Sequence, residues 1–223
     1  MAMTAAPASH ERKHPQRMSA PNRRRQIVRT AMALFARRGF KGTTTKEIAL
    51  AAGVNEAIIF RHFPTKSELY SAIIDDKMEE CREWINRVHE KAGQRKDDRA
   101  LFCDLALGIL TFHHQDGTFM RLLLYSALEG HELSRMFFET QVAEHFSFLA
   151  DYIAQRIDDG VFRAVNPKVA ARAFLGMVVN QAQVRELFDP KGKLLNIDDP
   201  AAAAAFADIF LHGVLQPART KRS

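Results

Sequence analysis

From Arg23 onward, apolar residues recur at helical spacing almost throughout, and the first half of the chain shows no strand-like alternation. One face of the first predicted helix is formed by Ile27, Ala31, Leu34 and Phe35. Gly39 is expected to end this helix, because glycine tolerates the backbone conformations that close helices. The pattern therefore predicts an amphipathic helix at the start of the folded chain.

Two short helices are predicted next, separated by a glycine turn. Thr44 and Glu47 have the spacing of a capping box, in which each residue satisfies a backbone group of the other. The inward face of the helix that follows is formed by Ile48, Ala49 and Ala52. Gly53 can supply the turn, and Asn55 is a good N-cap for the next helix.

A second capping box, Thr65-x-x-Glu68, follows Pro64 and predicts a long helix to about Val88 or beyond. The second half breaks at 91–98, 114–118, 129–131, 158–160 and 189–200. Helical stretches lie between the breaks, at 99–113, 119–129, 131–157, 167–188 and 200–215. The predicted fold is all-α, with about nine helices: an N-terminal three-helix helix-turn-helix head and a larger C-terminal bundle.

Charge divides the chain in the same place. Residues 1–70 carry 13 Lys or Arg against 4 Asp or Glu, a net of +9, whereas residues 71–223 carry 19 against 22, a net of −3. We therefore predict a disordered basic arm over 1–20, a DNA-binding domain over 21–68 and a separate globular domain over 69–223. Met18 is an alternative start.

Several classes of protein are disfavoured by composition. No apolar run is long enough to cross a bilayer, and the N-terminus lacks the apolar core of a secretory signal. The two cysteines, Cys81 and Cys103, are widely spaced, as expected of free thiols in the cytoplasm. No Cys-x-x-Cys, His-Glu-x-x-His, Gly-x-Ser-x-Gly or phosphate-binding Gly-rich loop occurs, so we expect no metal, no cofactor and no enzymatic activity.

The head has the groups that a helix-turn-helix needs to read DNA. Apolar residues that would fix the angle between its two helices are Ile48, Ala49, Val54, Ile59 and Phe63. Residues placed to meet phosphates are Thr44, Lys46, Arg61, His62 and Lys66. The recognition helix opens with Asn55, Glu56, Ala57 and Ile58, which would face base edges.

These motifs together resemble the tetracycline-repressor (TetR) family of bacterial regulators. The family pattern stands here as Gly39-Phe40, then Thr43-Thr44-Thr45-Lys46-Glu47-Ile48-Ala49, then Gly53-Val54-Asn55, then Phe60-Arg61-His62-Phe63-Pro64-Thr65-Lys66-Ser67-Glu68-Leu69. The likeness covers about 48 residues. It implies that residues 69–223 form a ligand-binding and dimerisation domain. It also implies a homodimer that binds double-stranded DNA and responds to a small hydrophobic or amphipathic molecule.

By that resemblance, Thr44, His62 and Lys66 contact phosphates, while Glu56 and Ala57 face base edges. Two residues depart from the family pattern. Glu56 is an acid, which repels phosphate but can accept a hydrogen bond from cytosine N4. Phe60 stands where tyrosine is usual and lacks a hydroxyl for a phosphate. With Ile58 against a thymine methyl, we expect C·G and T·A pairs under this helix.

Some of these residues have simpler interpretations. His62 and Lys66 can be ordinary surface residues, and Phe63 belongs to the core. Arg23, Arg24 and Arg25 can be a solvated charge run, or they can contact phosphates or the minor groove.

An effector pocket in the body is implied by the resemblance. Candidate lining residues are Phe102, Phe112, His113, Met120, Met136, Phe137, Gln141, Met177 and Gln181, with His114, His145 and Asn180 as further polar candidates. Most of the aromatic and methionine residues are core by default, and each polar residue can simply be satisfied or exposed. A lipid-like or acyl effector is the first expectation, and a drug-like aromatic compound is the second.

Dimerisation would use the last two helices, as the resemblance implies, with Phe174, Val178, Phe206, Ile209, Phe210 and Gly213 as candidate contacts. Each can instead pack within its own subunit. An effector would shift the body towards a conformation that swings the 65–88 helix and releases DNA. Two alternatives remain: a sequence-nonspecific architectural DNA binder, and an all-α enzyme or acyl-carrier-type binder with an incidental basic head.

Overall fold

The computed structural model describes residues 18–95 and 97–215, without the side chains of residues 92–95, 132, 133 and 141. Within these ranges it contains ten α-helices and one π-helical turn, with a single isolated bridge between Phe162 and Leu215 in place of any sheet. No helix in this part of the chain is long and apolar enough to cross a membrane. The all-α prediction is confirmed.

The head contains three helices before the long helix that leaves it. They are α1 (Ala20–Arg38), α2 (Thr45–Ala51) and α3 (Glu56–His62). The predicted capping box is present, since Thr44 Oγ1 accepts from Glu47 N at 3.2 Å and Glu47 Oε2 accepts from Thr44 N at 2.9 Å. Asn55 Oδ1 caps α3 by accepting from Ile58 N at 2.9 Å. Local signals therefore set these helix starts.

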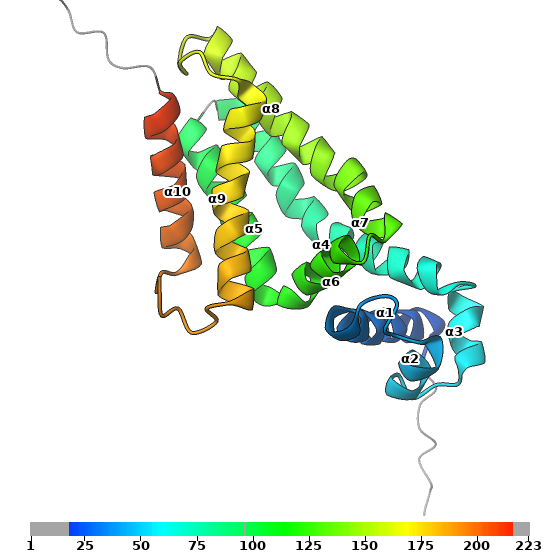
Figure 1. Ribbon diagram of the computed structural model, residues 1–223. Helices are drawn as coiled ribbons and strands as arrows, with labels where there is room; N and C mark the ends of the chain where they lie inside the picture. The colour runs from blue at the N-terminus through cyan, green and yellow to red at the C-terminus, as the bar shows by residue number, and fades with distance from the viewer. Residues whose placement is uncertain (1–17, 96, 216–223) are drawn as a thin grey trace, which may run out of the picture.

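The long helix α4 (Lys66–Arg95) connects the head to the body (Figure 1). Thr65 caps it by accepting a hydrogen bond from Glu68 N at 3.1 Å. The helix runs beyond Val88, as the prediction allowed, and it continues to Arg95, inside the break that was predicted at 91–98. Of the predicted arm 1–20, residues 1–17 lie outside the described residues, and Ala20 already belongs to α1.

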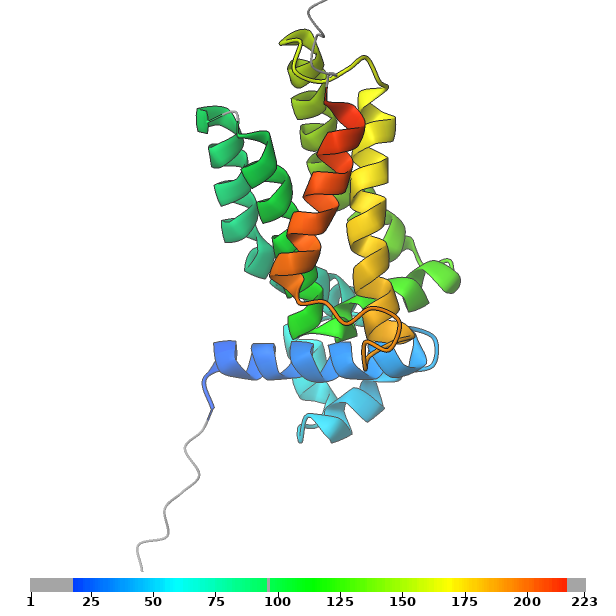
Figure 2. The same cartoon turned by 90° about the vertical axis from the view of Figure 1, so that its left-hand side faces the viewer.

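The body consists of the remaining helices. They are α5 (Asp98–Gln115), α6 (Gly117–Leu128), α7 (Glu132–Phe137), the π-helical turn η1 (Phe138–Val142), α8 (Ala143–Asp158), α9 (Pro167–Leu187) and α10 (Asp199–Val214). Because α7, η1 and α8 follow one another without a gap, the described chain forms nine helical rods, as predicted. Figure 2 shows α1 crossing the end of this bundle.

Buried side chains form two cores. One fills the body between α5, α8, α9 and α10. The other fills the head, and it includes two residues from the body, Phe119 and Leu122 on α6. Tyr70 also joins the two parts, since its hydroxyl donates to the Leu122 carbonyl at 3.2 Å. The head is therefore packed directly onto α6 as well as being linked through α4.

Candidate nucleic-acid interface

The turn between α2 and α3 holds the two helices through buried apolar residues. Ile48, Ala49, Ile59 and Phe63 are buried, and Val54 packs partly buried against them. Gly53, with φ of 64°, supplies the left-handed turn residue between the helices. This packing fixes α3 relative to α2, which a recognition helix requires.

Most residues predicted to meet DNA lie at the surface of this unit. Those exposed are Thr44, Lys46, Asn55, Ala57, Phe60 and Arg61, and those half-buried are Glu56, Ile58, His62 and Lys66. Ile58 is in part a core residue, because it packs against the head cluster. The N-terminal turn of α3 therefore presents exposed positions, Asn55 and Ala57, that can enter a major groove.

The Glu56 carboxylate already has a partner within the head, since it accepts a hydrogen bond from the Thr45 hydroxyl. This contact joins the start of α2 to the start of α3. It also orients the carboxylate at the end of the recognition helix while leaving lone pairs for a base amino group. The predicted contact with cytosine stays a prediction, and the structure adds Thr45 as the residue that positions it.

Lys66 points inward in this structure. Its ammonium group donates to the Phe40 carbonyl and lies 4.0 Å from the centroid of the Phe40 ring. Partial burial lowers the pKa of Lys66, and the nearby Glu129 carboxylate opposes that shift. A phosphate contact by Lys66 stays a prediction, and it would require the side chain to leave this position.

Two of the three arginines at the start of α1, Arg23 and Arg24, make contacts within the head. The Arg24 guanidinium lies 5.0 Å from the centroid of the Phe63 ring, and Arg23 donates to Gln26 at 2.7 Å. Gln26 in turn donates to the Ala52 carbonyl at 3.2 Å, which ties α1 to the end of α2. Arg25 is exposed, and among these three arginines it has the least structural role in the described contacts.

A body residue that the sequence did not single out, Glu129, holds the loop between α1 and α2. Its carboxylate accepts from the Phe40 N–H at 2.9 Å and from the Lys41 N–H at 3.4 Å. Gly39 has φ of 71°, and a Cβ atom there would collide with the Glu129 carboxylate. The His131 ring centroid lies 4.1 Å from that of Phe40. No sequence spacing links residues 89 apart, so only the three-dimensional structure could reveal this contact.

The predicted effector-pocket residues lie in several parts of the body. Phe102 and Met120 are fully buried in the body core, while Met136 is nearly half exposed at the surface. Phe112 and Phe137 pack edge-on against Phe119 where α5, α6 and α7 meet. In this structure, close packing with neighbouring helices occupies these aromatic side chains. Their place in an effector pocket stays a prediction.

The remaining predicted pocket residues are dispersed. Met177 and Gln181 are half-buried on α9, and the side chain of Gln141 lies outside the described residues. His113, however, lines a cavity of about 380 Å³ between α5, α9 and the loop that joins α9 to α10. Within the described residues, no group of three or more His, Cys, Asp or Glu side chains could hold a metal ion.

The predicted dimer contacts fall on two sides of their helices. Phe174, Val178 and Phe210 are buried in the core of their own subunit, which leaves them no surface to present to a partner. Phe206 is half-buried, whereas Ile209 and Gly213 are exposed on α10. Of the predicted dimer contacts, only Phe206, Ile209 and Gly213 have surface that a second subunit could contact.

Replacing Glu129 with alanine is expected to accelerate hydrogen exchange at the Phe40 and Lys41 amides, because both lose their acceptor. Amide exchange measured by NMR tests this expectation. Glu129→Gln is the matched control, since it keeps one acceptor oxygen and should have the smaller effect. Equal exchange rates in all three proteins would show that the contact does not order the loop.

Because His113 is buried, we expect the folded protein to lose stability in acid. Burial lowers the pKa of His113 to about 4, whereas in the unfolded chain it is about 6.5. As pH falls from about 7 to about 4, the unfolded chain takes up a proton that the folded chain excludes, so stability falls across that window and levels off below it. Between pH 7 and pH 5 the effect is about 2 kcal/mol.

His113→Leu should lose correspondingly less stability over this interval when denaturant unfolding is measured at both pH values. The same replacement at exposed His212 serves as the control and should leave the pH dependence of the parent protein. Parallel pH profiles for the parent and His113→Leu would contradict the expectation.

Comparison with known proteins agrees with this architecture. The model of bacterial regulatory proteins of the tetR family matches residues 27–73, and that of the C-terminal domain of AefR-like transcriptional repressors matches residues 104–213. An HTH-type transcriptional repressor of Mycobacterium tuberculosis H37Rv is 38% identical over 76 residues, which span 33% of this chain and 38% of that repressor.

Two solved structures share the fold. AibR in complex with isovaleryl coenzyme A and operator DNA has a TM-score of 0.64 at 24% identity, covering 87% of this chain and 99% of AibR. The fatty acid degradation regulator FadR from Bacillus halodurans has a TM-score of 0.68 at 16% identity, covering 88% of this chain and 98% of FadR. With both of its modules matched, the chain belongs to the TetR family of DNA-binding transcriptional regulators.

Proposed function

We propose that this regulator is a repressor that binds a palindromic operator as a homodimer and leaves it when a small, largely apolar effector binds the body. The exposed N-terminal turn of α3, carried on a head whose core includes α6, supports the proposal most directly. The net charge of +9 over residues 1–70 adds an electrostatic attraction to DNA. Such a protein acts in the compartment that holds the chromosome.

Two heads are needed because α3 has only seven residues and reads a few base pairs. The surfaces of α9 and α10 are suited to join two subunits. Val169 and Ile209 are 65% and 60% exposed, and a Cβ atom added at Gly176 or Gly213 would meet nothing within 4 Å. These residues provide an apolar surface on which two helix pairs can approach closely.

The effector class is supported by the relatives. AibR was solved with isovaleryl coenzyme A and operator DNA, and FadR is named as a fatty acid degradation regulator. An acyl or other lipid-like compound is therefore the first choice for this chain, and a drug-like aromatic compound is the second.

Release from DNA would follow from movement of the helices that the head shares with the body. α4 belongs to both modules, and α6 holds the head through Phe119, Leu122 and Glu129. A body conformation that shifts either helix changes the separation of the two recognition helices. Because heads must fit successive major grooves about 34–36 Å apart, such a change weakens operator binding.

Selection of bound sequences from random duplex DNA tests the proposal. The expected result is an enriched inverted repeat with C·G and T·A pairs under α3. Salt-sensitive binding without an enriched motif would favour the architectural DNA binder, because phosphate contacts alone carry no sequence information. Failure to bind DNA at low salt would favour the all-α enzyme or acyl-carrier-type binder.

Glu56→Ala should change the selected motif at one position in each half-site, because a base hydrogen bond contributes roughly 1–3 kcal/mol of discrimination. Thr45→Val, which removes only the hydroxyl that orients Glu56, should broaden the preference at the same position. Glu79→Ala, an exposed acid on the body side of α4, is the control and should return the parent motif. A motif unchanged by Glu56→Ala would rule out base reading by this residue.

Gly176→Arg or Ile209→Arg should convert the dimer to a monomer and lower operator affinity by at least tenfold, because a charge would be buried in the apolar interface. Sedimentation velocity and operator titration measure the two effects. Leu128→Arg is the matched control, since Leu128 is 86% exposed and lies on α6 away from α9 and α10. Dimeric variants with full operator affinity would place the interface elsewhere.

A further inference from the structure

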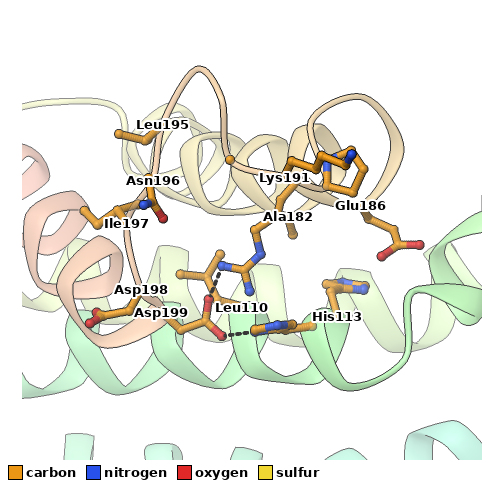
Figure 3. Close-up of a pocket in the computed structure, with 14 residues that line it drawn as sticks. Leu110, His113, Ala182, Glu186, Lys191, Leu195, Asn196, Ile197, Asp198 and Asp199 are labelled. Atoms are coloured by element: carbon orange, nitrogen blue, oxygen red, sulfur yellow. Dashed lines mark hydrogen bonds and ion pairs between the residues drawn. The ribbon is translucent and has the colours of Figure 1, made fainter.

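A cavity of about 380 Å³ lies between the C-terminal ends of α5 and α9 and the loop that joins α9 to α10 (Figure 3). Its apolar walls include Leu110, Ala182, Leu195 and Ile197. In size it lies within the range of small-molecule sites. Eight of its 14 lining residues are polar or charged, so it suits a ligand with both an apolar and a polar part. The cavity lies at the end of the body that carries the head.

The loop over the cavity is held in a defined shape. The Asp189 carboxylate accepts from the Lys193 N–H at 2.8 Å and from the Leu194 N–H at 2.7 Å. Gly192 has φ of 62°, which allows the chain to turn between these contacts. The cavity wall is therefore formed before any ligand enters.

Two nitrogen atoms of the lining side chains have no hydrogen-bond partner among the described residues. Arg185 Nη1 donates to Asp199 at 2.6 Å. Its Nη2 is buried and, within the described residues, has no hydrogen-bond partner. His113 Nδ1 is likewise buried and unpaired as far as the structure describes the chain. A guanidinium nitrogen can only donate, so Arg185 Nη2 lacks an acceptor that a molecule in the cavity can supply once the side chain turns towards it.

We propose that this cavity binds a small monocarboxylic acid with an apolar body, whose carboxylate accepts from Arg185 Nη2 and is within reach of His113. The apolar part lies against Leu110, Ala182 and Ile197. Three acids, Glu186, Asp198 and Asp199, line the cavity together with Arg185 and Lys191. The acids repel a dianion such as phosphate more strongly than a monoanion. The buried Arg185 nitrogen that has no partner among the described residues matches one carboxylate oxygen.

Contacts lead from this cavity to the head. Glu186 on its wall accepts from Arg121 Nε at 3.1 Å, and Arg121 Nη2 donates to the Glu186 carbonyl at 2.9 Å. Arg121 lies on α6, and just past the end of that helix Glu129 holds the Phe40 and Lys41 amides. A bound acid that shifts the end of α9 would therefore act on the helix that holds the head. This regulatory consequence rests on the proposed function, whereas binding itself does not.

Calorimetry on the full-length protein tests the site with named probes: hexanoate, benzoate and phenylacetate, each beside its primary amide. At least one acid should bind with a Kd below about 1 mM, and its amide should bind at least tenfold more weakly. Arg185→Gln should lower the affinity for that acid at least tenfold. Arg99→Gln is the matched control, because it removes an exposed arginine–aspartate pair between α5 and α10 and should leave the affinity unchanged.

A second variant guards against misfolding of Arg185→Gln. Ala182→Leu narrows the cavity while leaving Arg185 intact, and it should also weaken binding. The proposal is overturned if none of the three acids binds, or if the acids bind both variants as they bind the parent. Operator selection distinguishes failure of this proposal from failure of the proposed function. An enriched repeat with no acid binding would support the proposed function and overturn the acid site. Acid binding without an enriched DNA motif would support the acid site and overturn the proposed function.

Discussion

The packing of α1 against α6 is the constraint on which the rest of this structure depends. Phe119 and Leu122 belong to the same buried cluster as Ile27, Phe35 and Tyr70, so the head completes its core with residues from the body. A head of three helices, two of them only seven residues long, has little apolar surface of its own to bury. Moving α6 therefore disturbs the head, because a close-packed core transmits displacement rather than absorbing it.

Polar contacts fix the position of the head relative to the body at this junction. Glu129 binds two amides of the loop between α1 and α2, and Lys66 at the start of α4 donates to the Phe40 carbonyl in the same loop. The loop is thus held from α6 and from α4 at once. The sequence suggested α4 as the lever, since it belongs to both modules, but the structure supplies a second connection. A change in either helix reaches the support of α2.

Local signals made the helices predictable, and the lack of such signals explains what was missed. The Thr44 box and the Asn55 cap act within one turn, so the sequence alone locates the start of α2 and α3. Whether Phe102 lines a pocket or fills a core depends on which helix packs against it. Periodicity identifies the apolar face of a helix, but it does not identify the helix that packs on that face. The same limit hid the inward turn of Lys66 and the role of Glu129, whose partner is distant in sequence.

One helix, α9, takes part in all three proposals for the body: the dimer surface, the acid-binding cavity and the transmission to the head. Phe174 and Gly176 are two residues apart, which places them about 200° apart around the axis, so the first packs inward while the second is exposed. One turn beyond Val178, the inner side of the helix reaches the cavity at Ala182 and Arg185. A rigid helix cannot shift at one end without moving its other contacts. A ligand at Arg185 would therefore alter the subunit surface and the hold of α6 on the head together.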